Sequence, residues 1–250
     1  LFPIPNSDFI HSRLTHSLEV CSVGTSLGSL VAQRIKEKKL ATNISSYFAR
    51  DIANIVGAAC LLHDIGNPPF GHSGEEAVSV FYRQNAKKYK PYLSHKVLQQ
   101  LSNFDGNPQT VRFIHNSNDL NLTLTTIAAV LKYPTTYSKT SIYDGKYSVF
   151  ISEVQLFERV TSACGLKRYK NSNYYCRHPL SFLVEAADDI CYRLLDLEDA
   201  HKLQLVSYED AEYLLLQIIA SKNKNIGQIK EFIKNLVAED KFARLRSYAL

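Results

Sequence analysis

The stretch "LLHDIGNPPFGH", residues 61–72, places an imidazole and a carboxylate directly after a hydrophobic run. Gly66 and Pro68 are typical signals for the end of a helix, so we expect His63 and Asp64 to occupy its last turn. That end of a helix carries partial negative charge, which makes a carboxylate unfavourable there unless a cation joins it. Adjacent helical side chains point about 100° apart, but a fraying last turn can direct both toward one point. A metal ion would meet this requirement, although a single His-Asp pair is more often a surface cap than a site, so further ligands are needed.

A second imidazole, that of His16, could complete such a site. It stands three residues after Arg13, so a helix would place a cation and an imidazole on one face. We expect this face to lie beside a core stripe that includes Leu14 and Leu18. A single histidine in such a place is more often a core-edge residue with satisfied hydrogen bonds than a ligand. Both interpretations of His16 stay open on this evidence.

The segment "DDICYRLLD", residues 188–196, carries polar side chains at intervals of four. In a helix Asp188, Tyr192 and Asp196 lie on one face and span about 12 Å, roughly the reach of a metal ion, a phosphate chain and a sugar. Asp189 points about 100° away from this face and stands four residues before an arginine, which is typical of a surface ion pair. We therefore expect Asp188, and not Asp189, to point inward.

Helices must position these groups. Apolar residues recur at helical spacing and predict helices over residues 13–36, 48–64, 181–201 and 208–221. Pro179 suits the start of the third helix, since proline is favoured at the first helical position. At the other end of that helix, Glu198 and Asp199 are expected to form a solvated acidic terminus.

One segment departs from the helical pattern. Between Pro134 and His178 the composition shifts to Ser, Thr, Tyr and Lys, and "KYSVFIS" alternates as a short strand does. We expect residues 134–178 to be a loop-rich insertion with at most a β-hairpin. No internal repeat or glycine-rich phosphate loop is visible, so residues 1–250 are predicted to form one all-α unit that contains this insertion.

Composition favours a globular protein, with 45% hydrophobic and 21% charged residues. The longest apolar stretch, Ile55 to Leu62, is far short of the roughly 20 residues that span a membrane, and no leader pattern opens the sequence. Five cysteines without zinc-type spacing predict free thiols in a reducing compartment, hence the cytoplasm. The net charge of +5 suits a protein that handles nucleotides, although surface lysines explain it equally well. A start at Leu1 and the absence of methionine indicate a fragment.

Five segments resemble, in the same order, the deoxyguanosine triphosphate triphosphohydrolases of the HD-domain superfamily: "RLTHSLEV", "LLHDIGNPPFGHSGE", "FDGNPQTVRF", "LNLTLTTIAAVLKYP" and "HPLSFLVEAADDICYRLLDLEDA". The resemblance extends from the first residues to about His201 and implies an all-α HD-domain helical bundle. It implies a set of metal ligands made of His16, His63, Asp64 and Asp188. It also implies contacts with the substrate from Arg13, Tyr192, Asp196, Asn107 and Lys132.

Among these contacts, the resemblance implies that Arg13 binds a phosphate. It also implies that Tyr192 and Asp196 bind the deoxyribose and its 3′-hydroxyl. It further implies a catalytic histidine at His72 with an acidic partner at Glu75. His72 would assist proton transfer, and Glu75 would orient it or modify its charge.

The same stretch contains an S-x-x-E pattern, since Ser73 is followed three residues later by Glu76. This pattern is typical of a capping box at the start of a helix. We therefore assign Glu76 to structure.

The implied ligands are two imidazoles and two carboxylates without a thiolate. Such a set suits Mn²⁺, Mg²⁺ or Fe²⁺ better than a structural zinc ion, and it leaves room for water and a phosphate oxygen. A metal ion there can activate water and offset charge on phosphoryl oxygens. The expected reaction converts a dNTP, above all dGTP, to deoxynucleoside and inorganic triphosphate. The family resemblance also implies a homo-oligomer, often a hexamer, with dNTP or single-stranded DNA as effectors, while the lack of a long apolar stretch predicts no membrane partner.

Two other functions remain open. Another HD-domain phosphohydrolase, such as a 5′-nucleotidase or a cyclic-dinucleotide phosphodiesterase, would keep the metal ligands but should lack the series formed by Asp188, Tyr192 and Asp196. A non-catalytic dNTP sensor could dispense with His72 and Glu75. Because all five residues are present, the sequence favours the triphosphohydrolase.

Overall fold

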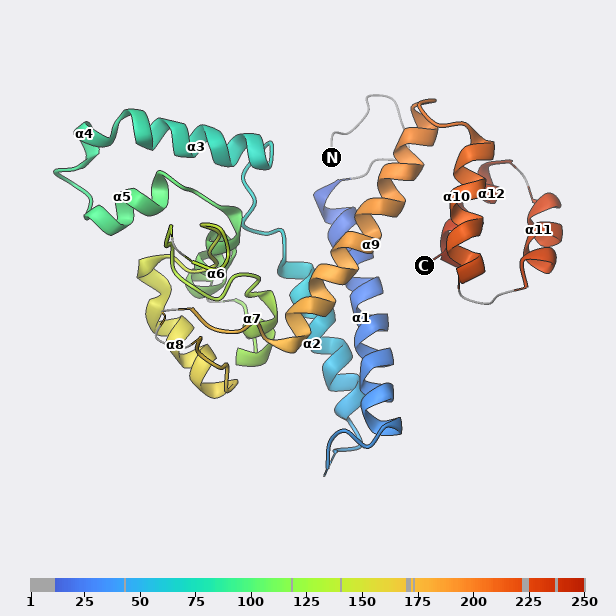
Figure 1. Ribbon diagram of the computed structural model, residues 1–250, viewed down its shortest axis with the longest axis horizontal. Helices are drawn as coiled ribbons and strands as arrows, with labels where there is room; N and C mark the ends of the chain where they lie inside the picture. The colour runs from blue at the N-terminus through green and yellow to red at the C-terminus, as the bar shows by residue number, and fades with distance from the viewer. Residues whose placement is uncertain are drawn as a thin grey trace. The chain divides into compact units, whose positions relative to one another are not determined.

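The structure is a computed structural model that describes residues 12–42, 44–117, 119–139, 141–169, 172, 174–221, 225–236 and 238–249. Helices make up nearly all of its regular structure (Figure 1). They are α1 (Arg13–Glu37), α2 (Phe48–Leu62), α3 (His72–Gln84), α4 (Ala86–Tyr89), α5 (His95–Leu101), α6 (Gly106–Asn116), α7 (Leu124–Val130), the 3₁₀ helix η1 (Ile151–Glu153), α8 (Val154–Ala163), α9 (Pro179–Lys202), α10 (Tyr208–Ser221), α11 (Ile226–Lys234) and α12 (Ala238–Ala249). Within the described residues there is no strand, which confirms the all-α fold class.

The chain divides into two compact units, Leu1–Ala187 and Asp188–Leu250, with the boundary inside α9. The first unit holds α1 to α8 and the first turns of α9. The second holds the rest of α9 together with α10, α11 and α12.

In the first unit, α1 and α2 lie side by side (Figure 1). The face of α1 that is buried repeats every four residues and consists of His16, Val20, Gly24, Gly28 and Ala32, with Ser17 beside it. A Cβ atom on Gly24 would overlap the Cys60 sulfur, and one on Gly28 would lie 2.9 Å from the Ala53 Cα. The two backbones can therefore approach closely only because these positions carry no side chain.

This arrangement corrects the core stripe predicted for α1. Leu14 and Leu18 are 69% and 55% exposed, so they do not belong to the buried face. The glycines and small residues pack there instead, because close contact between backbones replaces the burial of large side chains. The bounds of the helix, by contrast, agree with the predicted residues 13–36 to within one residue.

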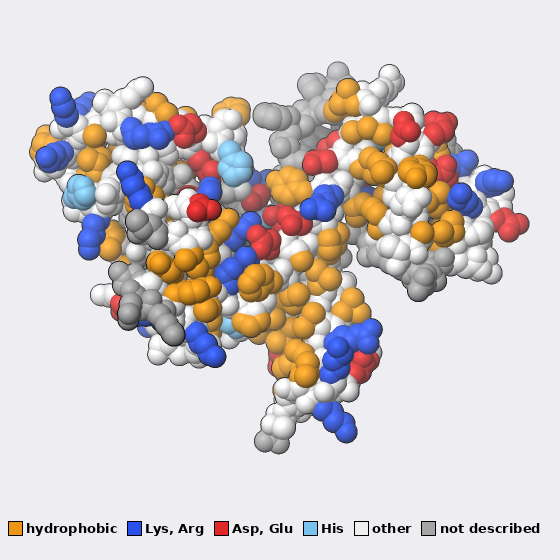
Figure 2. Space-filling view, in the orientation of Figure 1, with side chains coloured by type: hydrophobic (Ala, Val, Ile, Leu, Met, Phe, Trp, Pro, Cys, Tyr) orange, Lys and Arg blue, Asp and Glu red, His pale blue; other side chains and the backbone are white. Residues whose placement is uncertain are grey.

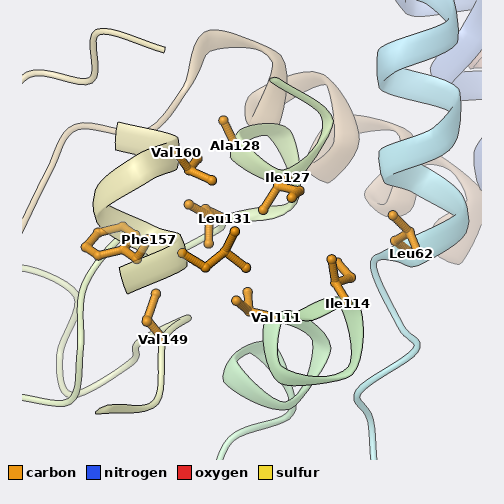
Figure 3. Close-up of a cluster of buried hydrophobic side chains, with 10 residues drawn as sticks. Leu62, Val111, Ile114, Ile127, Ala128, Leu131, Val149, Phe157 and Val160 are labelled. Atoms are coloured by element: carbon orange, nitrogen blue, oxygen red, sulfur yellow. The ribbon is translucent and has the colours of Figure 1, made fainter. Parts of the chain in front are cut away.

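Large side chains build the other core of the first unit. Figure 3 shows Val111 and Ile114 of α6, Ile127 of α7 and Val160 of α8 pointing into one cluster. Leu62, the last residue of α2, joins the same cluster. The core therefore fixes the point at which α2 ends and the turn with His63 begins.

The segment "KYSVFIS", residues 146–152, which alternates as a short strand does, forms no strand. Val149 makes only an isolated bridge with Thr136. The four residues 147–150 are all buried, so the segment has no exposed face of the kind that an alternating strand presents. The hydroxyl of Tyr147 donates a hydrogen bond to the Gln100 carbonyl at 3.0 Å, and burial raises the pKa of this tyrosine. Residues 134–178 also contain α8, which the loop prediction did not anticipate.

In the second unit, α9 to α12 pack around their own apolar cluster, which includes Leu194, Leu215, Ile219 and Leu245. Glu198 of α9 is only 6% exposed. Its carboxylate accepts from Arg246 of α12 at 2.6 Å and pairs with Lys202 at 2.9 Å. The prediction of a solvated acidic end was therefore wrong for Glu198, because two cations balance its charge where it is buried.

Charged side chains are spread over the surface. On the face that Figure 2 shows, lysine and arginine side chains are interspersed with acidic and apolar ones over the elements of each unit. None of the described helices combines the length and the apolar character that crossing a membrane requires.

Candidate active site

The turn after α2 carries the groups that the sequence singled out. The helix ends at Leu62, and His63 is its C-cap with φ −56° and ψ −35°. Hydrogen bonds from Ile65 N to the Leu62 carbonyl (3.2 Å) and from Asn67 N to the Asp64 carbonyl (3.1 Å) continue a tight turn. The helix thus stops before the predicted residue 64, and His63 and Asp64 lie in the turn that follows it.

His16, His63 and Asp64 converge on one point. Each offers one ligand atom, and these atoms all lie within 4.8 Å of one another. His16 is fully buried on α1, and its ring centroid lies 5.4 Å from that of His63. The close packing of α1 on α2 is what brings residue 16 to the end of α2.

The hydrogen bonds of His63 select the nitrogen that faces this point. Its Nδ1 lies 2.6 Å from the Cys60 carbonyl oxygen, which can only accept. Nδ1 must therefore carry a proton, and in the neutral ring Nε2 has the lone pair that a metal ion needs. Nε2 lies 3.6 Å from Oδ1 of Asp64, on the side of the convergent group.

Asp64 is oriented by Asn67 and Arg13. The Asn67 amide donates to Oδ1 of Asp64 at 2.6 Å. Arg13 donates to the backbone carbonyls of Asn67 (2.9 Å) and Pro68 (3.3 Å), and its Nε lies 3.9 Å from Oδ2 of Asp64. The Arg13 side chain remains 46% exposed. Asn67 was not identified from the sequence, although its position three residues after Asp64 could have indicated it.

His72 and Glu75 form a second group at the start of α3. Nδ1 of His72 lies 2.7 Å from Oε2 of Glu75, so the carboxylate can fix the ring. The other oxygen of Glu75 accepts from the Gly106 N–H at 2.7 Å. The His72 side chain is 93% exposed and that of Glu75 only 11%. A buried carboxylate therefore holds an imidazole whose other nitrogen is open to solvent.

The capping box predicted from Ser73 and Glu76 does not form. The N-cap of α3 is Gly71, with φ +54° and no side-chain cap, so Ser73 lies inside the first turn. Phe70 before it also has a positive φ of 66°, so the chain enters the helix through two left-handed residues. Glu76 pairs with Arg83 on the surface of α3. Glu76 therefore has a structural role, as predicted, but through an ion pair and not through a capping box.

Asp188, Tyr192 and Asp196 lie on α9, which is a continuous helix from Pro179 to Lys202. Their spacing of four residues places them on one helical face. All three belong to the second unit. Their roles as metal ligand and sugar contacts remain predictions.

Asn107 and Lys132 have other partners. The backbone N–H and the side-chain amide of Asn107 both donate to Oδ1 of Asp105, at 2.8 and 2.7 Å. Lys132 pairs with Glu185 at 3.1 Å, and Arg177 binds the same carboxylate at 2.7 Å. Burial alone would raise the pKa of Glu185, but hydrogen bonds from Arg177 and Lys132 outweigh it and lower that pKa. The structure does not show these two residues within the convergent group.

The donor set of the convergent group fits a divalent metal ion. Two imidazole nitrogens and a carboxylate oxygen form a mixed donor set that suits Mn²⁺, Mg²⁺ or Fe²⁺, and the absence of thiolates disfavours a structural zinc site. The Cys60 carbonyl holds Nδ1 of His63 and directs Nε2 to this group, and Asp64 is anchored by an amide, as ligating carboxylates commonly are. The residues present can therefore hold such an ion.

Comparison with known proteins agrees with this geometry. The family described as the HD domain matches residues 13–112, a range that contains the convergent group and the His72–Glu75 pair. A Pseudomonas aeruginosa protein named deoxyguanosinetriphosphate triphosphohydrolase-like is 39% identical over 227 residues, which are 87% of this chain and 50% of that protein. A Synechocystis protein of the same name is 36% identical over 258 residues, 96% of this chain and 58% of that protein.

A Klebsiella pneumoniae protein named deoxyguanosinetriphosphate triphosphohydrolase is 32% identical over 245 residues, covering 84% of this chain and 47% of that protein. The chain spans about half the length of these curated relatives. The matches confirm the family resemblance: residues 13–112 match the HD domain, and the chain is similar, over most of its own length, to the deoxyguanosinetriphosphate triphosphohydrolase-like proteins.

Proposed function

We propose that this chain carries the catalytic centre of a metal-dependent phosphohydrolase that converts dNTPs, above all dGTP, to deoxynucleoside and inorganic triphosphate. The observation that carries the proposal is the convergence of His16, His63 and Asp64 within 4.8 Å. The names of the relatives point to the same substrate class.

His16, His63 and Asp64, with Asp188 as the predicted fourth ligand, would hold Mn²⁺, Mg²⁺ or Fe²⁺. When bound, a divalent ion supplies an activated water and positive charge for the phosphoryl oxygens. Hydrolysis joins the water oxygen to the α-phosphorus and breaks the bond between that phosphorus and O5′. The departing O5′ takes up a proton, which leaves deoxynucleoside and intact triphosphate.

His72 is the group proposed to move a proton in this reaction. Glu75 lies 2.7 Å from its Nδ1, so the carboxylate fixes the ring and favours the proton on Nδ1. Nε2 then faces solvent and can accept a proton from water or, once charged, deliver one to O5′. The burial of Glu75 keeps this pairing in place.

The remaining residues would bind the nucleotide. A guanidinium has five N–H donors, and Arg13 uses two nitrogens on the carbonyls of Asn67 and Pro68. Its half-exposed side chain could therefore also contact a phosphate. Tyr192 and Asp196 are proposed to hold the deoxyribose and its 3′-hydroxyl. Asn107 and Lys132 are proposed to contact the nucleotide, for which Lys132 would have to exchange its partner Glu185.

We extend the proposal to a cytoplasmic homo-oligomer, with a hexamer as the expected form and dNTP or single-stranded DNA as effectors. Light scattering in the absence and presence of a dNTP or an oligodeoxynucleotide tests this part.

The reaction is tested by incubating the chain with Mn²⁺ or Mg²⁺ and each dNTP, singly and as a mixture, and separating the products by anion exchange. Deoxynucleoside and intact triphosphate, formed fastest from dGTP, are the expected products. Monophosphate or orthophosphate would instead indicate another HD-domain phosphohydrolase. Binding of metal ion and dNTP without turnover would favour a nucleotide sensor.

A further inference from the structure

We propose that the first turn of α6, residues 106–110, is a positioning element that fixes the His63–Asp64 turn and the His72–Glu75 pair relative to each other. This inference rests on the proposed function, because it assigns the two groups to one reaction. Its evidence is a set of contacts between segments that are far apart in the sequence.

Thr110 connects α6 to the metal-binding turn. Its hydroxyl accepts from the Gly66 N–H at 3.1 Å and donates to the Gly106 carbonyl at 3.3 Å. Thr110 is 1% exposed, so no water replaces these bonds. A Cβ atom on Gly66 would overlap the Thr110 nitrogen and the Gly106 oxygen. The turn can therefore sit on α6 only with a glycine at position 66.

Gly106 lies between the two functional groups. Its N–H binds Oε1 of Glu75 at 2.7 Å, at the positive end of α6 where a carboxylate is favoured. A Cβ atom on Gly106 would overlap Oδ1 of Asn67 and would lie 3.1 Å from Oε1 of Glu75. Asn67 orients Asp64, and Glu75 orients His72. One residue of α6 thus contacts the positioning partner of each group.

The start of α6 is itself firmly held. Asp105 is its N-cap, and the Asp105 side chain is only 4% exposed. The carboxylate accepts two hydrogen bonds from Asn107 and pairs with Lys146 at 2.9 Å. Burial alone would lower the pKa of Lys146, but the hydrogen bond and the charge of Asp105 raise it. Because the start of α6 is anchored in this way, it can hold the His63–Asp64 turn and the His72–Glu75 pair in fixed positions.

The substitution Thr110→Val removes the hydroxyl and leaves the buried Gly66 N–H without its acceptor. We expect kcat for the dNTP to fall about 10- to 100-fold while KM changes less than about threefold, because a misplaced group affects the reaction more than binding. We expect the affinity for Mn²⁺ alone to fall about tenfold or more, because Gly66 lies two residues after Asp64 and a shift of this turn would displace that carboxylate. Thr110→Ser keeps the hydroxyl and should restore both quantities.

Thr161→Val is the matched control. Thr161 is also a buried threonine whose hydroxyl donates to a helix carbonyl, that of Glu158 at 3.1 Å, but it lies on α8. Equal losses in Thr110→Val and Thr161→Val, or failure of Thr110→Ser to restore kcat, would overturn the inference. If the unaltered chain hydrolyses no dNTP while Thr110→Val alone loses affinity for Mn²⁺, the proposed function fails, but the role of Thr110 in positioning the His63–Asp64 turn stands.

Hydrogen exchange on the unaltered chain provides a second measurement that needs no variant to fold. The Gly66 N–H should exchange slowly, because it is buried and bonded to Thr110. Exchange as fast as that of an exposed loop amide would contradict the contact on which the inference depends.

Discussion

The convergent group of His16, His63 and Asp64 and the His72–Glu75 pair at the start of α3 differ most in their exposure. His16 is fully buried, and the side chains of His63 and Asp64 are 12% and 16% exposed, whereas that of His72 is 93% exposed. A buried set of imidazoles and a carboxylate is held by packing and suits a resident cation. An exposed imidazole fixed at one nitrogen suits exchange of protons with water or a substrate. Substitutions in the two groups should therefore have different effects on Mn²⁺ binding and on turnover.

The largest loss is expected for Asp64→Ala. It removes a ligand from the convergent group, so Mn²⁺ binding should be abolished and turnover should fall by about 1000-fold or more. Calorimetric titration with Mn²⁺ and the product assay measure the two effects. Asp51→Ala removes an exposed aspartate in the first turn of α2, and this control should leave both unchanged. Retained Mn²⁺ affinity in Asp64→Ala would contradict the assignment.

A comparable loss is expected for Asp188→Ala, which the sequence predicts to be the fourth ligand. Asp189→Ala should lose much less, because the neighbouring carboxylate points about 100° away on α9. Metal analysis of the two purified variants makes the comparison. Equal loss in the two would show that the assignment of the helix face is wrong.

His72→Ala should reduce turnover by about 100- to 10,000-fold, as is typical for loss of a general acid or base, and leave Mn²⁺ affinity unchanged. This separation between binding and turnover sharpens the contrast with Asp64→Ala. Glu76→Gln, on the same helix but paired with Arg83, is the control. A loss of Mn²⁺ affinity in His72→Ala as large as that in Asp64→Ala would remove the distinction between the two groups.

A smaller effect, on stability, is expected for Gly28→Ala. The added methyl group would lie 2.9 Å from the Ala53 Cα, a backbone atom that cannot rotate away. We expect a loss of about 1–3 kcal/mol in the free energy of unfolding, measured with a chemical denaturant. Ser29→Ala, at the exposed neighbouring position, is the control. Equal stability of the two variants would show that α1 and α2 do not pack through their glycines.

The smallest effect concerns Glu185 and depends on pH. The pKa of Glu185 in the folded state lies below its ordinary value. Its ion pairs therefore stabilise the fold fully at pH values above the ordinary pKa of a glutamate. This stabilisation is lost as the pH falls through the folded-state pKa, because the carboxylate becomes protonated. Glu185→Gln should cost up to about 1 kcal/mol at neutral pH and nothing in strong acid. Unfolding curves across this range test the expectation, with the exposed Glu158→Gln as control. A cost that is independent of pH would contradict it.

Much of the helical fold could be predicted because local patterns determine it. The bounds of α10 agree with the predicted residues 208–221, and the turn with His63 and Asp64 follows from the glycine and prolines after it. The buried face of α1 was missed because hydropathy ranks leucine above glycine. At this interface, close approach of two backbones outweighs the burial of large side chains.

One contact in the site was not predicted because it joins distant segments of the chain. The bond from Gly66 to Thr110 joins residues 44 positions apart, and no local pattern indicates it. The capping box failed for a local reason, because Phe70 and Gly71 at positive φ start the helix at His72. The pair of His72 and Glu75, in contrast, joins residues only three positions apart, and it was identified from the sequence.

Turnover of dGTP in water labelled with ¹⁸O tests most directly whether water attacks the α-phosphorus of a dNTP at this site. Mass spectrometry of the separated products locates the label. The account predicts that one ¹⁸O atom enters inorganic triphosphate and that the deoxynucleoside stays unlabelled. Label in the deoxynucleoside, or in released orthophosphate, would contradict it.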